Sequence, residues 1–561
     1  MEQWNKTNEM QNSNDVRIID LDSSLPDKNG ATGGSGNTLK IQVDSQSNYD
    51  SSTIEDSSTT STADIVQTVQ KLRHTFNRGV TKNIEWRRKQ LRNLQRMFED
   101  NKTAMVEALY KDLRRPKLEA FVLEINLMIN EVIHVLGSLD KWVKPEKPSK
   151  DFAQLLDDVI IYHEPFGVVL IIGTWNYPFQ LSLMPMAGAI AAGNTIVIKP
   201  SELADASAKL MAEMVPKYLD QNAFAVIEGG PKETTELLKQ RFDYIFFTGG
   251  TSIGRIVYEA AIKHLTPVTL ELGGKSPVYI DKTANILITA KRVLWAKFVN
   301  SGQTCVAPDY VICTKETQDK FLDAARKVLY ERFGNDVQKS SDYCRIIDKR
   351  HFNRLLSLID ESRLKIAIGG RSDESDNYIE PTVLANVTED DKIMEDEIFG
   401  PILPIVPVSN VEEAIRFINS REKPLVLYIF SKDKKVTKRF INETSSGNMV
   451  INDCLMHMSV DSLPFGGVGY SGFGSYHGKT SFDTFTHKKG ILKRDFSAIG
   501  EKLASGRYPP YSAGALGFLQ RVTRKRNLPS CRWCCYFFVF AAGFAVAAVL
   551  AVVWYKVIRE E

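Results

Sequence analysis

The stretch Gly167-Val-Val-Leu-Ile-Ile-Gly-Thr-Trp-Asn-Tyr-Pro-Phe179 decides how this chain folds. Its five apolar residues, Val168–Ile172, are flanked by glycines and are too few for a helix, which is typical of a strand buried on both faces of a parallel sheet. A helix is predicted to begin near Leu181. The polar turn between them therefore lies at the carboxyl end of a strand, where ligands bind in open parallel sheets.

The same alternation of short apolar runs and helical stretches continues toward the C-terminus. Further strands are predicted at Thr195–Ile198, Phe224–Ile227, Tyr244–Phe247 and Val268–Leu272, with crossover helices such as Asp205–Leu219 and Ile253–His264. A second series has strands at Val278–Ile280, Tyr310–Cys313, Ile402–Val408, Leu425–Phe430 and Met449–Ile451, and helices near Ala284–Val299 and Gln318–Phe333. The pattern predicts two α/β lobes built on parallel sheets, with an active site between them.

The N-terminal part of the chain differs in character. Residues 1–63 are rich in Ser, Asn, Asp, Gly and Thr and cannot bury enough apolar surface to offset their ordering entropy, so we expect disorder. From Ile65 to Trp142 apolar residues recur with helical spacing, which predicts several amphipathic helices. The stretch Lys144-Pro-Glu-Lys-Pro-Ser149 interrupts helix and forms a connector.

Composition excludes several classes of protein. The net charge of +3 on 561 residues, with basic residues mostly spread out, gives no reason to expect a nucleic-acid partner. Seven cysteines without framework spacing argue against an oxidised, secreted fold, and Cys531, Cys534 and Cys535 lack the second pair that a zinc site needs, so no metal is expected. Met1–Asp20 has no apolar core for a signal peptide. The catalytic body is expected in reducing cytosol.

The C-terminal segment Trp533–Tyr555 carries no charge and is long enough to cross a bilayer as a helix. The heavier basic flank, Arg521–Arg532, precedes it, so the positive-inside rule leaves the body in the cytosol. We therefore expect a transmembrane tail anchor. A buried core helix is the alternative.

Three polar residues in the predicted turns could carry chemistry. Cys305 follows a glycine-containing turn, and a positioned thiolate suits attack on a carbonyl carbon. Glu271 ends an apolar strand, an environment that makes general bases. The side-chain amide of Asn176 could stabilise an oxyanion. Taken singly, each has a structural alternative: a buried cysteine, a salt-bridged strand end and a turn asparagine.

Further turns suggest a nucleotide site. Thr248-Gly-Gly-Thr-Ser-Ile-Gly254 joins a strand to a helix, and its small residues would let backbone N–H groups face a phosphate. Lys199 and Glu202 could bind ribose hydroxyls. A tight turn without a ligand and solvent-facing side chains are the alternatives. The loops Glu397–Pro401 and Pro464–Gly472 have no role that the pattern alone reveals.

In this order, the motifs resemble the aldehyde dehydrogenase superfamily from about Asp64 to Lys493. The resemblance is carried by Thr174-Trp-Asn-Tyr-Pro, Lys199-Pro-Ser-Glu, Phe247-Thr-Gly-Gly-Thr, Glu271-Leu-Gly-Gly-Lys-Ser-Pro, Gly302-Gln-Thr-Cys, Glu397-Ile-Phe-Gly-Pro and Pro464-Phe-Gly-Gly. Cys305-Val-Ala-Pro-Asp-Tyr310 and Ser475-Tyr-His-Gly-Lys479 look like the class-three branch. With the hydrophobic tail, the chain is most similar to membrane-anchored fatty aldehyde dehydrogenases of lipid metabolism.

The resemblance implies NAD-dependent oxidation of aldehydes to carboxylic acids. Cys305 would form a thiohemiacetal whose oxyanion is held by Asn176, hydride would pass to nicotinamide, and Glu271 would activate the water that hydrolyses the thioester. The implied cofactor residues are Trp175, Lys199, Glu202, Thr248, Gly249, Gly250, Thr251, Ser252, Ile253, Gly254, Leu272, Glu397 and Phe399. The implied substrate-channel residues are Tyr177 and Phe465. Glu202 favours NAD over NADP by charge repulsion, although NADP is possible.

The family fold implies a domain order. A Rossmann-like NAD-binding domain (64–271, with a bridging hairpin near 151–165) and a catalytic domain (272–458) are followed by a bridging segment (459–495) that pairs subunits as a homodimer. A basic linker (496–532) and the tail anchor (533–555) complete the chain, with the endoplasmic reticulum the expected membrane. One departure is Gly250, where many relatives carry Ser or Asn. The anchor suggests medium- or long-chain aliphatic aldehydes.

Three other functions would use some of the same residues. A cysteine hydrolase would use a histidine base and no nucleotide loop, and the motifs contain no such histidine. An acylating dehydrogenase would pass the thioester to coenzyme A, whereas Glu271 favours water. A catalytically silent membrane scaffold would not need the set of Cys305, Glu271 and Asn176.

Overall fold

The computed structural model describes residues 61–151, 154, 157–494, 496–525, 540–548 and 550–551. The predicted disorder of residues 1–60 lies outside this part of the chain, as do residues 533–539, 549 and 552–555 of the predicted anchor. Helix α1 (Thr62–Asn77) begins directly after Ser61, whose hydroxyl accepts a hydrogen bond from the Asp64 amide and caps the helix.

The first lobe is built on a six-stranded sheet in the order β16-β6-β5-β2-β3-β4. Its strands are β2 (Val168–Ile172), β3 (Thr195–Lys199), β4 (Phe224–Val226), β5 (Tyr244–Thr248), β6 (Val268–Glu271) and β16 (Gly472–Phe473). The first five are parallel and lie within one residue of their predicted ends, so the predicted parallel sheet is confirmed. Strand β16 is antiparallel to β6 and was not predicted, because two residues give no periodicity.

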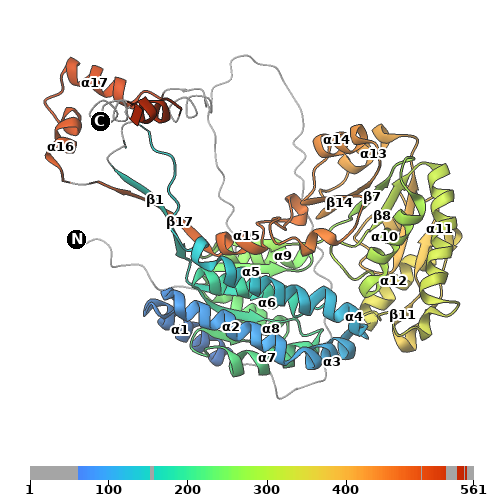
Figure 1. The fold of residues 1–561 in the computed structure, drawn as a ribbon. Coiled ribbons are helices and arrows are strands. Elements are labelled where there is room, and N and C mark those ends of the chain that lie inside the picture. Colours follow the sequence, from blue (N-terminus) through green and yellow to red (C-terminus); the bar gives the residue numbers. More distant parts are fainter. Residues whose placement is uncertain are drawn as a thin grey trace, which may run out of the picture. The chain divides into compact units, whose positions relative to one another are not determined.

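Helices cover both faces of this sheet (Figure 1). The helices of this lobe are α1, α2 (Ile84–Asp100), α3 (Lys102–Leu113), α4 (Lys117–Ala120), α5 (Asn126–Trp142), α6 (Gln180–Ala192), α7 (Asp205–Tyr218), α8 (Pro231–Lys239), α9 (Thr251–Ile262) and α15 (Gly478–Thr484). Of these, α1, α6, α7 and α9 pack directly on strands of the sheet. Helix α6 is buried on all sides and packs against α2, α5 and α15, which explains why its sequence is apolar all round. A π-helical turn, Phe121–Ile125, joins α4 to α5.

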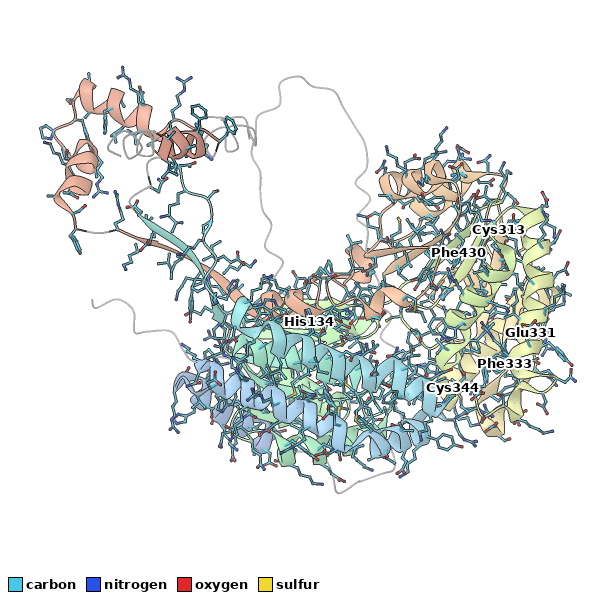
Figure 2. All side chains as sticks on the ribbon, in the orientation of Figure 1. His134, Cys313, Glu331, Phe333, Cys344 and Phe430 are labelled. Atoms are coloured by element: carbon cyan, nitrogen blue, oxygen red, sulfur yellow. The ribbon has the colours of Figure 1, made fainter. Side chains whose placement is uncertain are left out.

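The second lobe is built on a seven-stranded sheet in the order β15-β14-β7-β8-β13-β12-β9. Its strands are β7 (Pro277–Ile280), β8 (Tyr310–Cys313), β9 (Ile366–Ile368), β12 (Thr382–Leu384), β13 (Ile402–Pro407), β14 (Val426–Phe430) and β15 (Asn448–Ile451). Its helices are α10 (Ile286–Phe298), α11 (Lys315–Phe333), α12 (Lys349–Glu361), α13 (Val411–Asn419) and α14 (Lys434–Glu443). All pairings are parallel except that of β9 with β12. In Figure 2 the labels Cys313 and Phe430 show where β8 and β14 end.

The remaining described elements lie outside the two sheets. Strands β1 (Asp158–Pro165) and β17 (Thr486–Lys493) form an antiparallel ribbon, and β10 (Ser372–Asp373) pairs with β11 (Tyr378–Ile379). The predicted basic linker contains two helices, α16 (Ala498–Ala504) and α17 (Ala513–Thr523). Residues 540–548 and 550–551 are helical with exposed side chains.

One helical run among the described residues, Lys117–Trp142, is long and apolar enough to cross a membrane. Its α5 portion buries Met128, Val132, Val135 and Leu139 and packs against α2 and α6. This run is therefore a core helix of the first lobe and is not the predicted anchor.

Candidate active site

A cleft of ≈ 930 Å³ opens at the carboxyl ends of β2 and β5 and is closed by loops of the second lobe. Among the predicted residues, it is lined by Trp175, Asn176, Thr248, Gly249, Gly250, Thr251, Ser252, Cys305, Glu397 and Phe399. The structure therefore brings most of the predicted nucleophile and cofactor residues to one place. Five predicted cofactor residues do not line it: Lys199, Glu202, Ile253, Gly254 and Leu272.

Cys305 is presented to the cleft by a strained turn. Asn300 and Ser301 adopt left-handed φ angles of 52° and 50°, and Gly302 has φ 75°. A Cβ on Gly302 would lie 2.3 Å from the carbonyl oxygen of Gly400, so only glycine fits between the two loops. The turn leaves Cys305 partly exposed, with its Sγ 3.8 Å from Oε1 of Glu271.

The thiol and the carboxylate of this pair influence each other's ionisation. Glu271 is 1% exposed, and burial raises its pKa to about 7, while hydrogen bonding from the Thr248 hydroxyl (3.2 Å) acts in the opposite direction. Burial and the carboxylates of Glu271 and Glu397 raise the pKa of Cys305 well above its usual range. The resting thiol is therefore protonated, and a base with a pKa near neutral stands beside it.

Asn176 is fixed against the loop that carries the nucleophile. Its side-chain Nδ2 donates to the backbone carbonyl of Gln303 at 3.1 Å, and its backbone carbonyl accepts from Nδ2 of Asn300 at 3.0 Å. Its Oδ1 is buried without a hydrogen-bond partner in the described part of the chain. The side-chain amide thus lies beside the Cys305 turn, as an oxyanion donor requires.

A buried ion pair that the sequence analysis missed supports Asn176. Arg115 and Glu124 are both fully buried and pair with each other, and Arg115 also donates to the Asn176 carbonyl. Glu124 accepts from the backbone N–H groups of Phe179 and Gln180, both at 3.0 Å, at the start of α6. Arg115 stands in an Arg-Arg-Pro turn that resembles an exposed helix end, so pattern alone gave no signal.

The second lobe supplies the loop that carries Glu397 and Phe399. Lys275 and Asp309 form an ion pair at 2.6 Å, and Asp309 accepts from the Ile398 N–H at 3.0 Å. Burial and the charge of Asp309 raise the pKa of Glu397 to about 8. The ring of Phe399 meets Trp175 edge-on at 5.3 Å. This pair of rings joins the two sides of the cleft.

The glycine-rich turn fits a nucleotide phosphate. Helix α9 begins at Thr251 without a side-chain cap, so its first N–H groups are available at the cleft wall. A Cβ on Gly250 would meet open space, whereas one on Gly254 would lie 2.7 Å from the Leu272 side chain. Gly254 and Leu272 therefore pack the helix against β6 and do not face the cleft.

The other predicted residues lie at the edges of the site. Nζ of Lys199, at the carboxyl end of β3, pairs with Glu202 at 3.0 Å. Ile253 is 50% exposed on α9. The Tyr177 hydroxyl contacts Thr304 Oγ1 at 2.9 Å, directly before Cys305, and the buried ring of Phe465 stacks on His477 at 5.3 Å.

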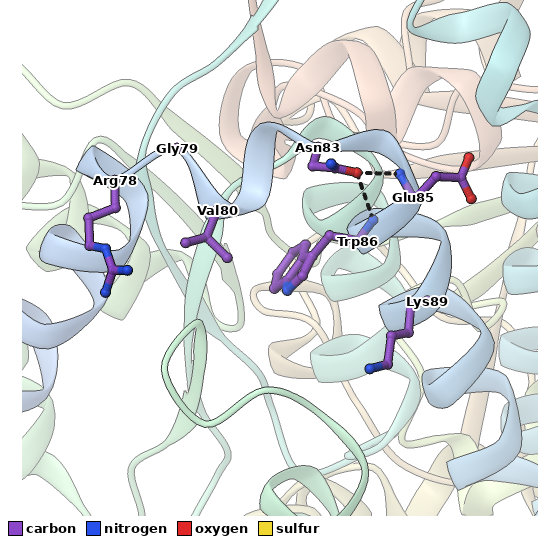
Figure 3. A pocket seen from close by; sticks show the side chains of 7 residues that line it. All are labelled: Arg78, Gly79, Val80, Asn83, Glu85, Trp86 and Lys89. Atoms are coloured by element: carbon purple, nitrogen blue, oxygen red, sulfur yellow. Dashed lines mark hydrogen bonds between the residues drawn. The ribbon is translucent and has the colours of Figure 1, made fainter.

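A second hollow lies between α1 and α2 (Figure 3). It is lined by Arg78, Gly79, Val80, Asn83, Glu85, Trp86 and Lys89, none of which is a predicted site residue. Its polar contact is the Asn83 side chain, which accepts from the Glu85 and Trp86 N–H groups and caps α2. This hollow therefore lies at the N-terminus of α2 and is not part of the candidate active site.

A nucleotide-binding parallel sheet whose cleft contains a cysteine next to a buried carboxylate is typical of oxidoreductases that form a covalent thiol intermediate. The chain belongs to the aldehyde dehydrogenase family, whose sequence profile matches residues 36–491. It oxidises aldehydes to carboxylic acids with NAD(P) as the oxidant.

Three curated relatives belong to or resemble family 3. Aldehyde dehydrogenase family 3 member B1 of Rattus norvegicus is 51% identical over 82% of this chain and 97% of its own length, and member A2 of the same species is 50% identical over 79% and 91%. A rat aldehyde dehydrogenase described as dimeric and NADP-preferring is 48% identical over 80% and 98%.

Solved structures show the same fold. AldH of Staphylococcus aureus in a substrate-bound state is 44% identical, with a TM-score of 0.79 over 82% of this chain and 99% of that one. An NAD+ complex of an aldehyde dehydrogenase from Bacillus cereus is 26% identical, with a TM-score of 0.69 over 78% and 90%. The predicted resemblance to this family is therefore confirmed.

Proposed function

We propose that Cys305, Glu271 and Asn176 perform the oxidation in this cleft. The observation that carries the proposal is the 3.8 Å contact between Sγ of Cys305, which lines the cleft, and Oε1 of Glu271, a buried base. The thiol loses its proton to Glu271, and the thiolate attacks the carbonyl carbon of the aldehyde. The Asn176 amide and the Cys305 N–H hold the resulting oxyanion.

NAD bound in the cleft would accept hydride from the thiohemiacetal, which would leave a thioester on Cys305. Glu271 first releases the proton that it took from the thiol and then takes a proton from a water molecule. The hydroxide oxygen bonds to the acyl carbon, and the carbon–sulfur bond breaks. The acid leaves, and the thiolate takes up a proton to restore the resting thiol.

We assign the cofactor contacts by position. Thr248–Ser252 offer uncapped N–H groups to the pyrophosphate, Lys199 and Glu202 stand at the adjacent strand end for the adenosine ribose, and Glu397 with Phe399 faces the nicotinamide ribose. Glu202 disfavours a 2′-phosphate by charge repulsion, so NAD is the preferred cofactor. One relative is named NADP-preferring, which keeps NADP as the second candidate.

The tail supports a membrane-bound enzyme for medium- or long-chain aliphatic aldehydes. Residues 540–548 are helical, and Phe540, Phe544 and Leu550 are exposed by 63% or more, as a lipid-facing helix would be. The basic residues Arg521, Arg524 and Lys525 precede it and keep the body in the cytosol, with the endoplasmic reticulum the favoured membrane. Truncation before Trp533 should release active enzyme into the soluble fraction, and continued sedimentation with membranes would contradict the anchor.

Homodimerisation is supported by an exposed apolar stripe on α9 and beyond its end. Ile256, Ile262 and Leu265 are 54%, 53% and 89% exposed, and the ring of Tyr258 contacts Phe473 of the edge strand at 5.3 Å. The β1–β17 ribbon lies outside both sheets and provides the bridging element of the proposed domain order. A relative is named dimeric.

The decisive experiment measures NADH formation from an aliphatic aldehyde. Cys305→Ala should abolish turnover, whereas Glu271→Gln should retain the first burst of NADH and accumulate an acyl-enzyme detectable by intact-protein mass spectrometry. Cys313→Ala, which removes a buried thiol of β8, is the matched control. Turnover by Cys305→Ala would refute the nucleophile.

Substrate choice is tested by kcat/KM over a series of aldehydes from short chains to about sixteen carbons. Efficiency should rise with chain length, because each buried methylene group contributes about 0.8 kcal/mol until the channel is filled. Equal or higher efficiency on small aromatic aldehydes would refute the fatty-aldehyde assignment.

A further inference from the structure

The proposed base Glu271 is enclosed, so a proton that it takes from water needs a way out. Its carboxylate is 1% exposed and interacts with three groups, the Cys305 thiol, the Thr248 hydroxyl and the Tyr476 hydroxyl. The first two belong to the reacting centre and to the neighbouring strand β5. Tyr476 belongs to neither and, like Glu271, does not line the cleft, so it is the candidate for carrying the proton away.

Tyr476 is held rigidly behind the base. Its backbone pairs with Phe465 through two hydrogen bonds, at 3.0 Å and 2.8 Å, and its ring packs against Phe246 and His477 at 5.1 Å and 4.5 Å. The hydroxyl is fully buried, and no partner in the described part of the chain meets strict hydrogen-bond geometry with it.

A second buried carboxylate, Glu131 of α5, lies near this segment, because it binds the N–H of Gly478, two residues after Tyr476. It is 0% exposed, its Oε1 accepts from the Gly478 N–H at 2.9 Å, and its Oε2 has no partner among the described residues. Tyr476 interacts electrostatically with both Glu271 and Glu131. Burial raises the pKa of Glu131 to about 7, close to that of Glu271, so a proton shared between the two is not trapped on either.

Beyond Glu131 the path reaches solvent within one helical turn. His134, labelled in Figure 2, is partly exposed, and its Nδ1 lies 3.8 Å from Oδ2 of Asp461. A Cβ on Gly478 would lie 3.3 Å from Nε2 of His134, so Gly478 stands between Glu131 and this surface pair. The other titratable neighbour, His477, stays neutral because burial lowers its pKa to about 3.

Helix capping alone does not explain Glu131. The bond from the Gly478 N–H occupies one oxygen at the start of α15, and a glutamine would make it equally well. A fully buried second oxygen without a partner costs about 1–3 kcal/mol. Such an atom is better accounted for by a partner that occupies it during turnover.

We propose that Tyr476 and Glu131 carry the proton of the deacylating water from Glu271 to the surface. Protonated Glu271 donates to the Tyr476 oxygen, and the Tyr476 hydroxyl donates its own proton to Glu131. Glu131 then releases a proton to solvent beside His134 and Asp461, and the hydroxyl rotates back. No electron moves, and one proton leaves for each thioester hydrolysed. The inference rests on the proposed function of Glu271, and Tyr476 and Glu131 are positioning residues in it.

The experiment uses the full-length enzyme and follows NADH and proton release together, with a pH indicator, in a stopped-flow instrument. Tyr476→Phe and Glu131→Gln keep shape, and the glutamine keeps the acceptor for Gly478. Each should retain the NADH burst, lower steady-state turnover by about tenfold or more, and make proton release lag behind NADH. Imidazole, a small proton carrier, should restore turnover. Tyr244→Phe, which removes a buried hydroxyl on β5 that contacts Thr269, is the control and should leave both phases unchanged.

Two results would overturn the proposal. One is unchanged turnover in both variants, and the other is an equal fall of burst and steady state that imidazole does not restore, which would indicate a structural role. Glu271→Gln is measured in parallel. If Glu271→Gln accumulates acyl-enzyme while Tyr476→Phe and Glu131→Gln turn over like the unaltered enzyme, the relay is refuted and the proposed function stands. If Glu271→Gln turns over normally, the proposed function itself is refuted.

Discussion

At the scale of single residues, the site depends on two carboxylates near Cys305, of which Glu271 is buried and Glu397 is partly exposed at the cleft. Glu271 and Glu397 both lie close enough to Cys305 to raise its pKa, and both have raised pKa values themselves. The Cys305 thiol is consequently protonated and weakly nucleophilic until a base such as Glu271 takes its proton. A protonated thiol resists oxidation between turnovers better than a thiolate does.

The pH dependence of turnover follows from Glu271. Its pKa is raised to about 7, so below that pH the carboxyl is protonated and cannot accept a proton from water. Deacylation-limited kcat should therefore rise with pH through about 7 and then level off. Thr248→Val removes a hydrogen bond that lowers this pKa, and since such a bond contributes about 1 kcal/mol, the rising limb should move up by up to about one pH unit.

The measurement is kcat against pH from 5 to 9. Thr266→Val, a buried threonine whose hydroxyl binds the Phe242 carbonyl, is the control and should leave the limb in place. A limb near pH 4.5 in the unaltered enzyme would contradict the assignment of Glu271.

The candidate catalytic residues could be predicted from the sequence, whereas the buried residues that contact them could not. Cys305, Glu271 and Asn176 stand beside glycines or at strand ends, and the structure brings the three side chains together. Arg115 and Tyr476 stand in segments that look exposed or merely aromatic, and only the packing of distant elements buries them. Long-range burial of a charge leaves no periodic signal in the chain.

At the scale of elements, helix α6 shows how a structural piece positions chemistry. It follows the turn that carries Asn176, it is buried on every side, and its first N–H groups are held by Glu124. Glu124 in turn is neutralised by Arg115, which also binds the Asn176 carbonyl. Hydrogen bonds thus join the helix and the ion pair to Asn176.

Breaking this ion pair should destabilise the protein and slow the reaction together. Arg115→Met leaves Glu124 buried without its partner, which costs about 3–5 kcal/mol, and frees the Asn176 carbonyl. We expect a clear fall in the thermal midpoint by scanning calorimetry and a fall in kcat larger than the change in KM. Arg114→Met, whose side chain is 52% exposed, should change the free energy of unfolding by no more than about 0.5 kcal/mol. Equal stability of the two variants would contradict this role.

Length alone does not separate the strands that the pattern predicts from those that it misses, since β4 has three residues and was predicted, whereas β9 and β12 have three and were not. The five parallel strands of the first sheet have continuous apolar runs and were located to within a residue. Strands β9, β12 and β16 have two or three residues and form only because a neighbouring strand offers an edge. The helices of the predicted basic linker, α16 and α17, were likewise missed. Short elements need partners that the chain places far away in sequence.

At the scale of the whole molecule, the surface of α9 predicts an assembly. Replacing two apolar side chains of the stripe, Ile256→Asp with Ile262→Asp, should convert a dimer to a monomer, because an unpaired charge in an interface costs several kcal/mol. Sedimentation velocity gives the mass. Leu364→Asp, at an exposed position in the second lobe, is the control and should remain dimeric. An unaltered dimer in the double variant would place the interface elsewhere.

The close contact between Gly302 and Gly400 should couple cofactor binding to the reactivity of Cys305. Because the turn before Cys305 and the loop that carries Glu397 and Phe399 are in close contact, a shift of one should displace the other. Gly302→Ala should therefore weaken NADH binding, measured by fluorescence titration, and alter the rate at which iodoacetamide labels Cys305, by similar factors. Gly250→Ala, where a methyl group meets open space, should do neither. Cofactor binding and the reactivity of the sulfur are thereby expected to change together.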